Sequence, residues 1–405
     1  MNFLKKLFKN DGVQSITSSI ISILIGIFVG FLVMIAITFI NKDTTFANAL
    51  SGLKTIFSGP FSSTITKYML ANTGNMIFYS VPLIFTGLSV AIAYKTGLFN
   101  IGAPGQYVMG TVGALLVALS FPASSRAEGI LVWLLALLVG TLLGALWGVI
   151  PGLLKAFFNI NEVIICIMTN WIAANISSWV FKYQINLQST GNNKGGFLEK
   201  VSELNATPKF GLDKLLPGSL IDGGIIIAIV VAIVIYIILN KTTFGFELKS
   251  CGSNKDSAKY AGLNEKRNII LSIAIAGALA GMGASLYYLN TGIEYKYISA
   301  YSALPAYGFN GIASAFLANC NPIGVVFSSL FIRYLNAGGD YLVQVGFNRY
   351  VADVVVAVII YMAGFTRIIR EWMKGSKNKK KPDKDIRDTK VTSTGEEVSK
   401  WQTLY

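Results

Sequence analysis

Five side chains of this sequence combine hydrogen-bonding amides with a flat aromatic ring inside apolar stretches. Asn100 and Gln106 lie near an irregular segment, and Asn170, Trp171 and Asn175 follow in a later apolar run. Amides donate and accept hydrogen bonds, and an indole can stack on a planar ring. Positions 171 and 175 share one face of a helix, whereas Asn170 is one residue removed from that face. These groups are suited to binding a polar solute. Alternatively, they form interhelical hydrogen bonds that only hold the helices together.

Groups for catalysis or metal binding are scarce in the sequence. It contains no histidine, and its three cysteines, Cys166, Cys251 and Cys320, are far apart. Neither a metal-ligand spacing nor a nucleophile with a neighbouring base is present. A phosphate-binding loop of the form GxxxxGKS/T is missing as well. We therefore expect no enzyme active site, no bound metal and no ATP site in this chain.

An irregular segment, residues 97–106, places three glycines, a proline and two uncharged amides within an otherwise apolar region. In hydrocarbon each unsatisfied backbone amide costs several kcal/mol, so irregular backbone persists only where protein or water covers it. The segment therefore predicts a break in a membrane span that lines a transport pathway.

The composition is that of a chain whose surroundings are mostly lipid. Of the 405 residues, 53% are hydrophobic and 13% are charged, and the mean hydropathy is +0.57. Since a helix crosses about 30 Å of hydrocarbon with about 20 residues, we expect an all-α polytopic membrane protein. The clearest apolar runs are residues 16–40, 76–94, 99–120, 129–154, 163–181, 222–239, 268–288 and 350–366. Glycines and an Asn-Pro pair interrupt a further region, 302–340. The expected bundle has about ten transmembrane helices, or alternatively eight, with broken or re-entrant segments.

The charge distribution divides the chain into three parts. Its net charge is +14, and the basic residues collect beside apolar runs, a pattern typical of cytoplasmic loops rather than of nucleic-acid binding. We expect residues 1–15 and a basic, disordered tail, 371–405, in the cytoplasm, on either side of a transmembrane domain of residues 16–370. Within this domain, 184–221 form an external loop and 240–267 a cytoplasmic one. The first apolar run is longer than the core of a signal peptide, which predicts a retained helix.

Two of the apolar runs carry small residues at the spacing of one helical turn. Gly140, Gly144 and Gly148 recur at every fourth position, and Gly277 and Gly281 repeat the pattern in a later run. Small residues let two membrane helices approach closely. The spacing predicts helix-packing seams.

The cytoplasmic segment 242–264 is too long and too patterned for a simple turn. It predicts a short helix between glycine breaks, which could dock into a cleft of a partner protein. The alternative is an ordinary solvated loop. The residues that form the pattern are Phe244, Gly245, Gly252, Ala258, Tyr260 and Gly262.

This pattern resembles the coupling loop of ABC importer permeases of the ribose and branched-chain amino acid type. Segment 97–106 resembles the GLFNIGAEGQ signature of the nucleoside-type subgroup of that family. Two further elements are similar to the subgroup: Asn161-Glu162-Val163 with Met168 and Asn170, and the GFNGIA stretch at 308–313. Pro104 and Asn310 stand where the subgroup carries glutamate and aspartate. Because both differences remove negative charge, they favour a neutral solute.

The resemblance implies the fold of a type II-like ABC importer permease in a bacterial cytoplasmic membrane. Such an importer also contains an ABC ATPase subunit, a second permease subunit, here expected to be a paralogue, and an external substrate-binding lipoprotein. This chain would bind no cofactor of its own, and ATP would act through the ATPase subunit by levering segment 244–262. Nucleosides are the expected substrates, and Phe309 joins the candidate pathway residues.

Glu162 has two interpretations. An acid at the cytoplasmic entrance of a span can take part in gating, and a carboxylate at the start of a helix can cap it. Two other functions also stay open: a permease for ribose or another simple sugar, and an ion-coupled secondary transporter. The second would normally depend on intramembrane carboxylates or histidines.

Overall fold

A computed structural model of the chain shows a bundle of long α-helices. It describes residues 11–40, 44–189, 195–299, 302–366, 368–369 and 371. The predicted segments 1–15 and 371–405 therefore lie outside the described residues, apart from 11–15 in the first helix and residue 371.

Seven helices in the described residues are long and apolar enough to cross a membrane. A pair of helices bent by 119° at a short break counts as an eighth span if the two helices are taken together, and a last apolar helix is shorter. By length and composition the described residues supply seven spans, or up to eight if the bent pair in region 302–340 counts as one, which is closer to the predicted alternative of eight than to ten. The seven are α2 (Asp11–Ile40), α4 (Thr66–Lys95), α5 (Ala103–Ser120), α6 (Arg126–Phe158), α7 (Glu162–Tyr183), α9 (Gly224–Lys241) and α12 (Glu265–Tyr288). The bent pair is α13 (Ala306–Leu317) with α14 (Pro322–Asp340), and the short helix is α15 (Arg349–Ala363).

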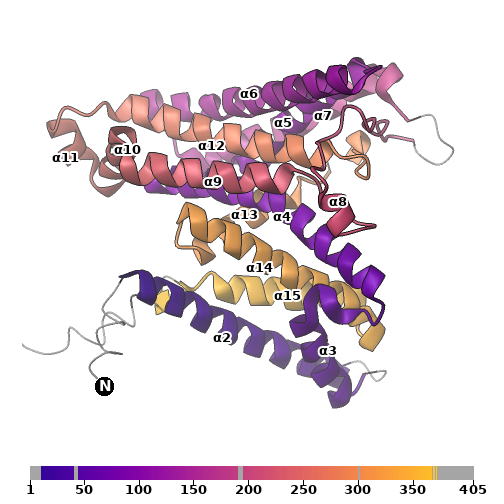
Figure 1. Ribbon diagram of the computed structural model, residues 1–405. Helices are drawn as coiled ribbons and strands as arrows, with labels where there is room; N and C mark the ends of the chain where they lie inside the picture. The colour runs from indigo at the N-terminus through magenta and orange to yellow at the C-terminus, as the bar shows by residue number, and fades with distance from the viewer. Residues whose placement is uncertain are drawn as a thin grey trace, which may run out of the picture.

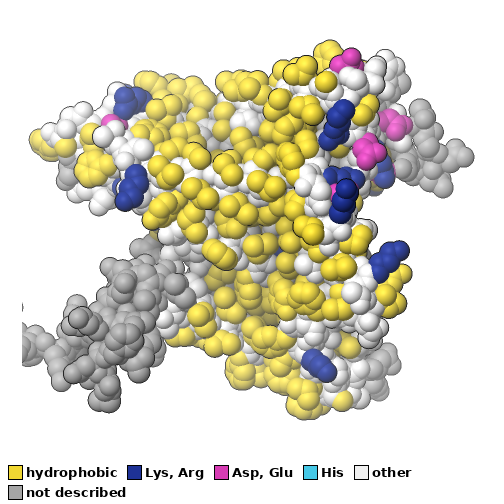
Figure 2. Space-filling view, viewed as in Figure 1, with side chains coloured by type: hydrophobic (Ala, Val, Ile, Leu, Met, Phe, Trp, Pro, Cys, Tyr) yellow, Lys and Arg dark blue, Asp and Glu magenta, His cyan; other side chains and the backbone are white. Residues whose placement is uncertain are grey.

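The helices form two groups that lie one above the other in Figure 1. One group contains α4 to α7, α9, α12 and α13, and the other contains α2, α14, α15 and the short helix α3 (Phe46–Ser58). The short helices α10 (Thr243–Ser253) and α11 (Lys255–Tyr260) project from one end, and α8 (Leu212–Leu215) lies at the opposite end. Figure 2 shows charged side chains gathered toward these two ends, with a broad apolar surface between them. This distribution is the one expected of a protein that crosses a membrane.

The predicted glycine seams are present and join three helices. Gly144 of α6 faces α12, where an added Cβ would stand 2.5 Å from the carbonyl oxygen of Gly277. Gly140 of α6 and Gly110 of α5 both lie against Gly281 of α12. The backbones of α5, α6 and α12 are therefore in contact, which only glycine permits.

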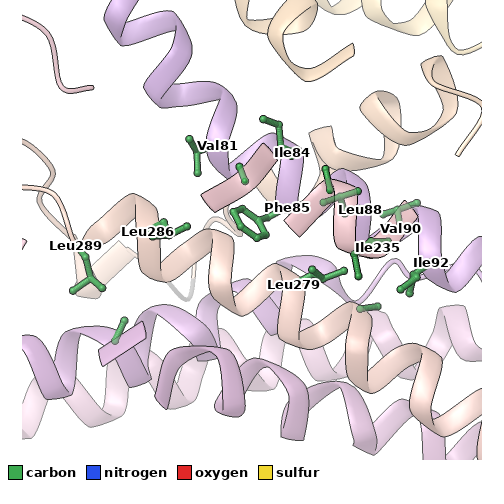
Figure 3. Packing of buried hydrophobic residues seen from close by; sticks show 14 of the residues in the cluster. Val81, Ile84, Phe85, Leu88, Val90, Ile92, Ile235, Leu279, Leu286 and Leu289 are labelled. Carbon is green, nitrogen blue, oxygen red and sulfur yellow. The ribbon is translucent and has the colours of Figure 1, made fainter. Parts of the chain in front are cut away.

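Larger side chains fill the space on the other side of α12. Phe85 of α4 is fully buried and packs on the backbone of α12 at Gly283. Figure 3 shows it between Leu279 and Leu286 of α12, with Ile235 of α9 nearby. Residues of α4, α9 and α12 thus belong to one buried hydrophobic cluster.

The two long loops are folded rather than simply extended. In the predicted external loop, η2 (Ile185–Leu187) and α8 are joined by stretches with buried side chains, among them Leu198 and Val201. The predicted cytoplasmic loop consists mainly of α10 and α11, as the helix interpretation of its pattern predicts. Three further short turns of 3-10 helix are η1 (Gly59–Ser62), η3 (Tyr297–Ser299) and η4 (Tyr341–Val345).

Candidate transport pathway and coupling segment

The chain breaks between α4 and α5, inside segment 97–106. Helix α4 ends at Lys95, and α5 begins at Ala103. Gly97 has a left-handed backbone with φ of +75°, a conformation that favours glycine. The predicted break is therefore present, and the irregular residues connect two largely buried helices.

Two amides of the break bind each other. The Nδ2 of Asn100 donates to Oε1 of Gln106 at 2.9 Å and to the hydroxyl of Ser89 at 3.0 Å. In return, Oδ1 of Asn100 accepts hydrogen bonds from Nε2 of Gln106 and from the backbone N–H of Gly102. Both side chains are buried. Their polar groups stabilise the irregular backbone in this conformation.

Asn170 of α7 braces the same break from a neighbouring helix. It is 1% exposed. Its Oδ1 accepts the backbone N–H of Gly105 at 2.8 Å, and its Nδ2 donates to the carbonyl of Ile101 at 2.9 Å. This bonding matches the interhelical alternative for Asn170. A role of Asn100, Gln106 or Asn170 toward substrate stays a prediction.

Trp171 and Asn175 point away from that network. Both are exposed on the outer face of α7, and Nδ2 of Asn175 donates to the carbonyl of Trp171 in the same helix. The structure thus brings Asn100, Gln106 and Asn170 together and separates the other two predicted residues from them. The one-residue offset along the helix accounts for the separation.

Helix α13 presents two different faces. Gly308 lies against Pro104 of α5, and Gly311 lies against Thr86 of α4. The opposite face carries Phe309 and Asn310, which are exposed and line a cavity of about 670 Å³ between α13, α14 and α15. Phe309 is thus the one predicted pathway residue that borders a described cavity.

Glu162 forms an ion pair at the turn between α6 and α7. Its carboxylate lies 3.0 Å from Nζ of Lys155, and both side chains are largely buried. Asn161, the residue before it, caps α7 by accepting the backbone N–H of Val163. Glu162 stands in the first turn of α7, where a carboxylate is favoured. Its gating role stays a prediction.

The predicted coupling residues divide into buried and exposed sets. Gly245 packs against the end of α9, Ala258 is buried, and Phe244 is partly buried. Tyr260, by contrast, is 95% exposed, and Gly262 is in a left-handed turn where an added Cβ would meet nothing within 4 Å. Phe246 of α10 is not among the predicted residues and is 68% exposed. Two aromatic rings are therefore offered to solvent or to a partner.

Gly252 of α10 contacts the break between α4 and α5. A Cβ at position 252 would collide with the carbonyl oxygen of Lys95, and a Cβ at Gly97 would stand 3.1 Å from the Cα of Gly252. The coupling helix therefore touches the backbone that leads into Asn100 and Gln106.

Charged side chains fix α10 to its neighbours. The carboxylate of Glu247 pairs with Arg267 of α12 at 2.7 Å. Lys249 donates to Oδ1 of Asn240 at the end of α9, and partial burial together with the nearby Lys95 ammonium lowers the pKa of Lys249. These contacts hold α10 on the ends of α9 and α12, so that a force on α10 reaches the long helices.

Sequence reasoning missed two charged residues. Asp222, just before α9, is buried, and Arg333 of α14 lies over the ring of Tyr79 at 4.9 Å. Arg333 also lines a smaller cavity, of about 270 Å³, with Tyr79, Asn72 and Tyr341. Both residues sit in or beside apolar runs, and this isolation is the signal that could have identified them.

Comparison with known proteins identifies the family of the chain. Residues 72–364 match the family described as "Branched-chain amino acid transport system / permease component". The chain is 32% identical over 365 residues to the nucleoside ABC transporter permease protein NupB of Lactococcus lactis, which covers 89% of this chain and 93% of NupB. It is 32% identical over 354 residues to the guanosine ABC transporter permease protein NupP of Bacillus subtilis, covering 87% and 93%.

A more distant relative is the nucleoside ABC transporter permease protein NupC of L. lactis. It is 27% identical over 265 residues, which cover 63% of this chain and 78% of NupC. No solved structure matches the chain. The family match includes the broken segment, the coupling helices and α13. The resemblance seen in the sequence is confirmed, and the chain belongs to the permease-component family of ABC transport systems as a multi-pass membrane protein.

Proposed function

We propose that this chain is a membrane-spanning permease subunit of an ATP-driven importer for nucleosides. One observation carries the proposal: about nine-tenths of the chain aligns with permeases named for nucleosides and for guanosine. The buried amides around the break and the absence of charge on Asn100, Gln106 and Asn170 suit an uncharged solute.

The partners follow from this role. A separate ABC ATPase subunit would hydrolyse ATP, since the chain carries no phosphate-binding loop, and an external lipoprotein would deliver the nucleoside. The second permease would be a paralogue, because L. lactis has both NupB and NupC, and this chain is similar to each. The complex would lie in the cytoplasmic membrane of a bacterium.

The orientation follows from the charge pattern. Helix α2 begins at the end of the bundle that carries α10 and α11 (Figure 1). This end has Lys241, Lys249 and Lys259, which by the positive-inside rule puts it in the cytoplasm. Both termini would then be cytoplasmic, and α8 would be external.

Contact between Gly252 and Gly97 supports a mechanical coupling. ATPase closure would move α10 through its exposed Phe246 and Tyr260, and α10 would push on the backbone between α4 and α5. Since packed helices switch between discrete arrangements rather than deforming smoothly, the bundle would rock between outward and inward access.

Uptake measurements test the substrate. Cells with and without the gene are compared for uptake of radiolabelled uridine and guanosine, with ribose and leucine as controls. The expected result is loss of nucleoside uptake alone. A defect in ribose uptake with normal nucleoside uptake would support the sugar permease instead, and loss of uptake on collapsing the ion gradient at constant ATP would support an ion-coupled transporter.

A substitution at the contact tests the coupling. Gly252→Lys cannot be accommodated against Lys95, so we expect nucleoside uptake to fall at least about tenfold while the complex still assembles. Ser253→Lys changes the adjacent, exposed residue by the same side chain and is the matched control. Wild-type uptake by Gly252→Lys in an assembled complex would contradict the mechanism.

A further inference from the structure

The cavity between α13, α14 and α15 carries polar groups at membrane depth. Asn310 of α13, Asn336 of α14 and Asp353 of α15 all line it. Asn310 and Asn336 belong to the bent pair of α13 and α14, and Asp353 belongs to the short apolar helix α15. None of the three makes a hydrogen bond or an ion pair within the part of the chain that the structure describes.

Such groups are costly against lipid. A carboxylate in a membrane helix normally faces a water-filled cavity or a partner, because hydrocarbon offers neither hydrogen bonds nor solvation. Asp353 and Asn310 are exposed, so they require an aqueous or polar surrounding on that side. The cavity is therefore hydrated, filled by a polar solute or faced by polar groups of a partner.

The other walls of the cavity are aromatic and uncharged. Phe309, Phe316, Tyr361 and Phe365 supply ring faces, and among the described residues the lining contains one acid and no lysine or arginine. The volume of about 670 Å³ lies in the usual range for small-molecule sites. Flat apolar walls with a few polar groups are the pattern of a site for a flat, partly polar molecule.

The ring of Phe316 connects the cavity with the broken segment 97–106. Phe316 lines the cavity, and its centroid lies 6.0 Å from the ring of Phe99, within the broken segment. Phe316 also contacts Tyr94 of α4 edge-on at 5.2 Å. A movement of the break produced by α10 would thus change the wall of the cavity.

We propose that this cavity is a nucleoside site within the membrane, in which the base stacks on the aromatic walls and the ribose hydroxyls donate to Asp353. The proposal rests on the proposed function of the chain. Asn310 and Asn336 offer both donors and acceptors to the polar edge of a base. A 2′,3′-diol presents two neighbouring O–H donors, which suit the two oxygens of a carboxylate. Because the described residues of the lining hold a negative charge and no cation, they would repel a nucleotide phosphate.

Thiol labelling in the assembled importer tests occupancy directly. Ala357 lines the cavity and is exposed, whereas the three native cysteines are buried. We expect Ala357→Cys to react with a charged methanethiosulfonate reagent in proteoliposomes without ATP. Uridine and guanosine should slow the reaction several-fold, and uridine monophosphate at the same concentration should not. Leu215→Cys, on the exposed α8 outside the spans, is the matched control and should react at the same rate with and without nucleoside.

Transport kinetics test the carboxylate. Loss of a hydrogen bond to a charged group corresponds to about 10- to 100-fold in affinity, so Asp353→Asn should raise the KM for uridine by about tenfold or more. The effect should be smaller for 2′,3′-dideoxyuridine, which lacks the diol. Asp213→Asn removes a charge from α8, far from the cavity, and should leave the KM unchanged.

Two outcomes separate the proposals. If the wild-type importer carries nucleosides, yet nucleosides do not protect Ala357→Cys and Asp353→Asn has the wild-type KM, the site assignment is wrong and the proposed function stands. Absence of nucleoside transport by the wild-type importer overturns both.

Discussion

Gly308 of α13 lies directly against Pro104 at the start of α5, where a Cβ at position 308 would stand 2.5 Å from the Cα of Pro104. The neighbouring residue Phe309 faces the cavity on the other side of α13. One turn of helix therefore connects the broken segment with the candidate nucleoside site. Pro104 is also the position at which the subgroup carries glutamate, so in this chain a rigid apolar ring takes the place of a charge at the contact.

This contact predicts the effect of enlarging Gly308. Gly308→Leu places a side chain into backbone that cannot move away cheaply, and overpacking of this kind costs about 1–3 kcal/mol. Since about 1.4 kcal/mol corresponds to a tenfold change, uptake should fall by about tenfold or more. In Gly324→Ala the nearest atom to the new Cβ is a methyl group at 3.1 Å, so this variant should retain most uptake. Equal uptake by the two variants would exclude a role for close packing at Gly308.

Substitutions of Asn170 and Asn175 should differ in their effect on stability, although both residues lie on α7. In Asn170→Ala the buried N–H of Gly105 and the carbonyl of Ile101 lose their partners, and each unsatisfied group costs about 1–3 kcal/mol. Asn175→Ala removes only an exposed bond to its own helix, so its effect should be small. Thermal melting in detergent, followed by size-exclusion chromatography, measures both variants. A similar melting temperature for the two variants would show that the hydrogen bonds of Asn170 contribute little to stability.

Some of this site can be predicted from the sequence, because glycine, proline and amides are rare in apolar runs. For that reason the sequence predicts the break at 97–106. It does not predict that Asn100 and Gln106 bind each other, since their separation depends on the path of the irregular backbone between them. The same limit applies to Asn310, Asn336 and Asp353, which lie on three helices and meet at one cavity only through their packing.

The same limit applies to the fold, because an interruption of a helix can be predicted from the local sequence and the angle between its two parts cannot. The sequence predicts that the region 302–340 is interrupted, but it does not predict the bend of 119°. The bend depends on two successive residues, Asn319 and Cys320, with φ of +51° and +53°, after which Pro322 starts α14. A left-handed pair of non-glycine residues is not apparent from composition. If the two bent helices count as one span, the described residues supply up to eight long spans rather than ten.

A substitution in the glycine seam between α6 and α12 should cause the largest loss of folded protein. In Gly144→Val the Cβ alone would stand 2.5 Å from the carbonyl oxygen of Gly277, and the two γ-methyl groups need further space. Because the obstacle is backbone on both sides, the helices would have to separate. We expect little folded protein after detergent extraction. Leu146→Val, at an exposed position two residues along the same helix, should extract normally and is the matched control.

The buried carboxyl of Asp222 should make stability depend on pH at the start of α9. It lies just before the span and is 3% exposed. Burial raises its pKa to about 7, although hydrogen bonds from Asn290 and the backbone N–H of Gly224 and the charge of Lys209 act in the opposite direction. In the unfolded chain the pKa is about 3.9. The folded protein therefore binds one more proton than the unfolded chain between about pH 4 and pH 7.

Stability should consequently decrease as the pH rises through that window and become level above about pH 7. The two pKa values correspond to about 4 kcal/mol at most. Melting temperatures measured in detergent from pH 4.5 to 8 should show this slope in the wild type and in the control Asp213→Asn, and the slope should be smaller in Asp222→Asn. The amide introduced by Asp222→Asn would still accept the N–H of Gly224, but its NH₂ group would meet the Nδ2 of Asn290, so the stability of this variant at pH 5 should be lower than that of the wild type. An unchanged slope in Asp222→Asn would assign the pH dependence to other groups.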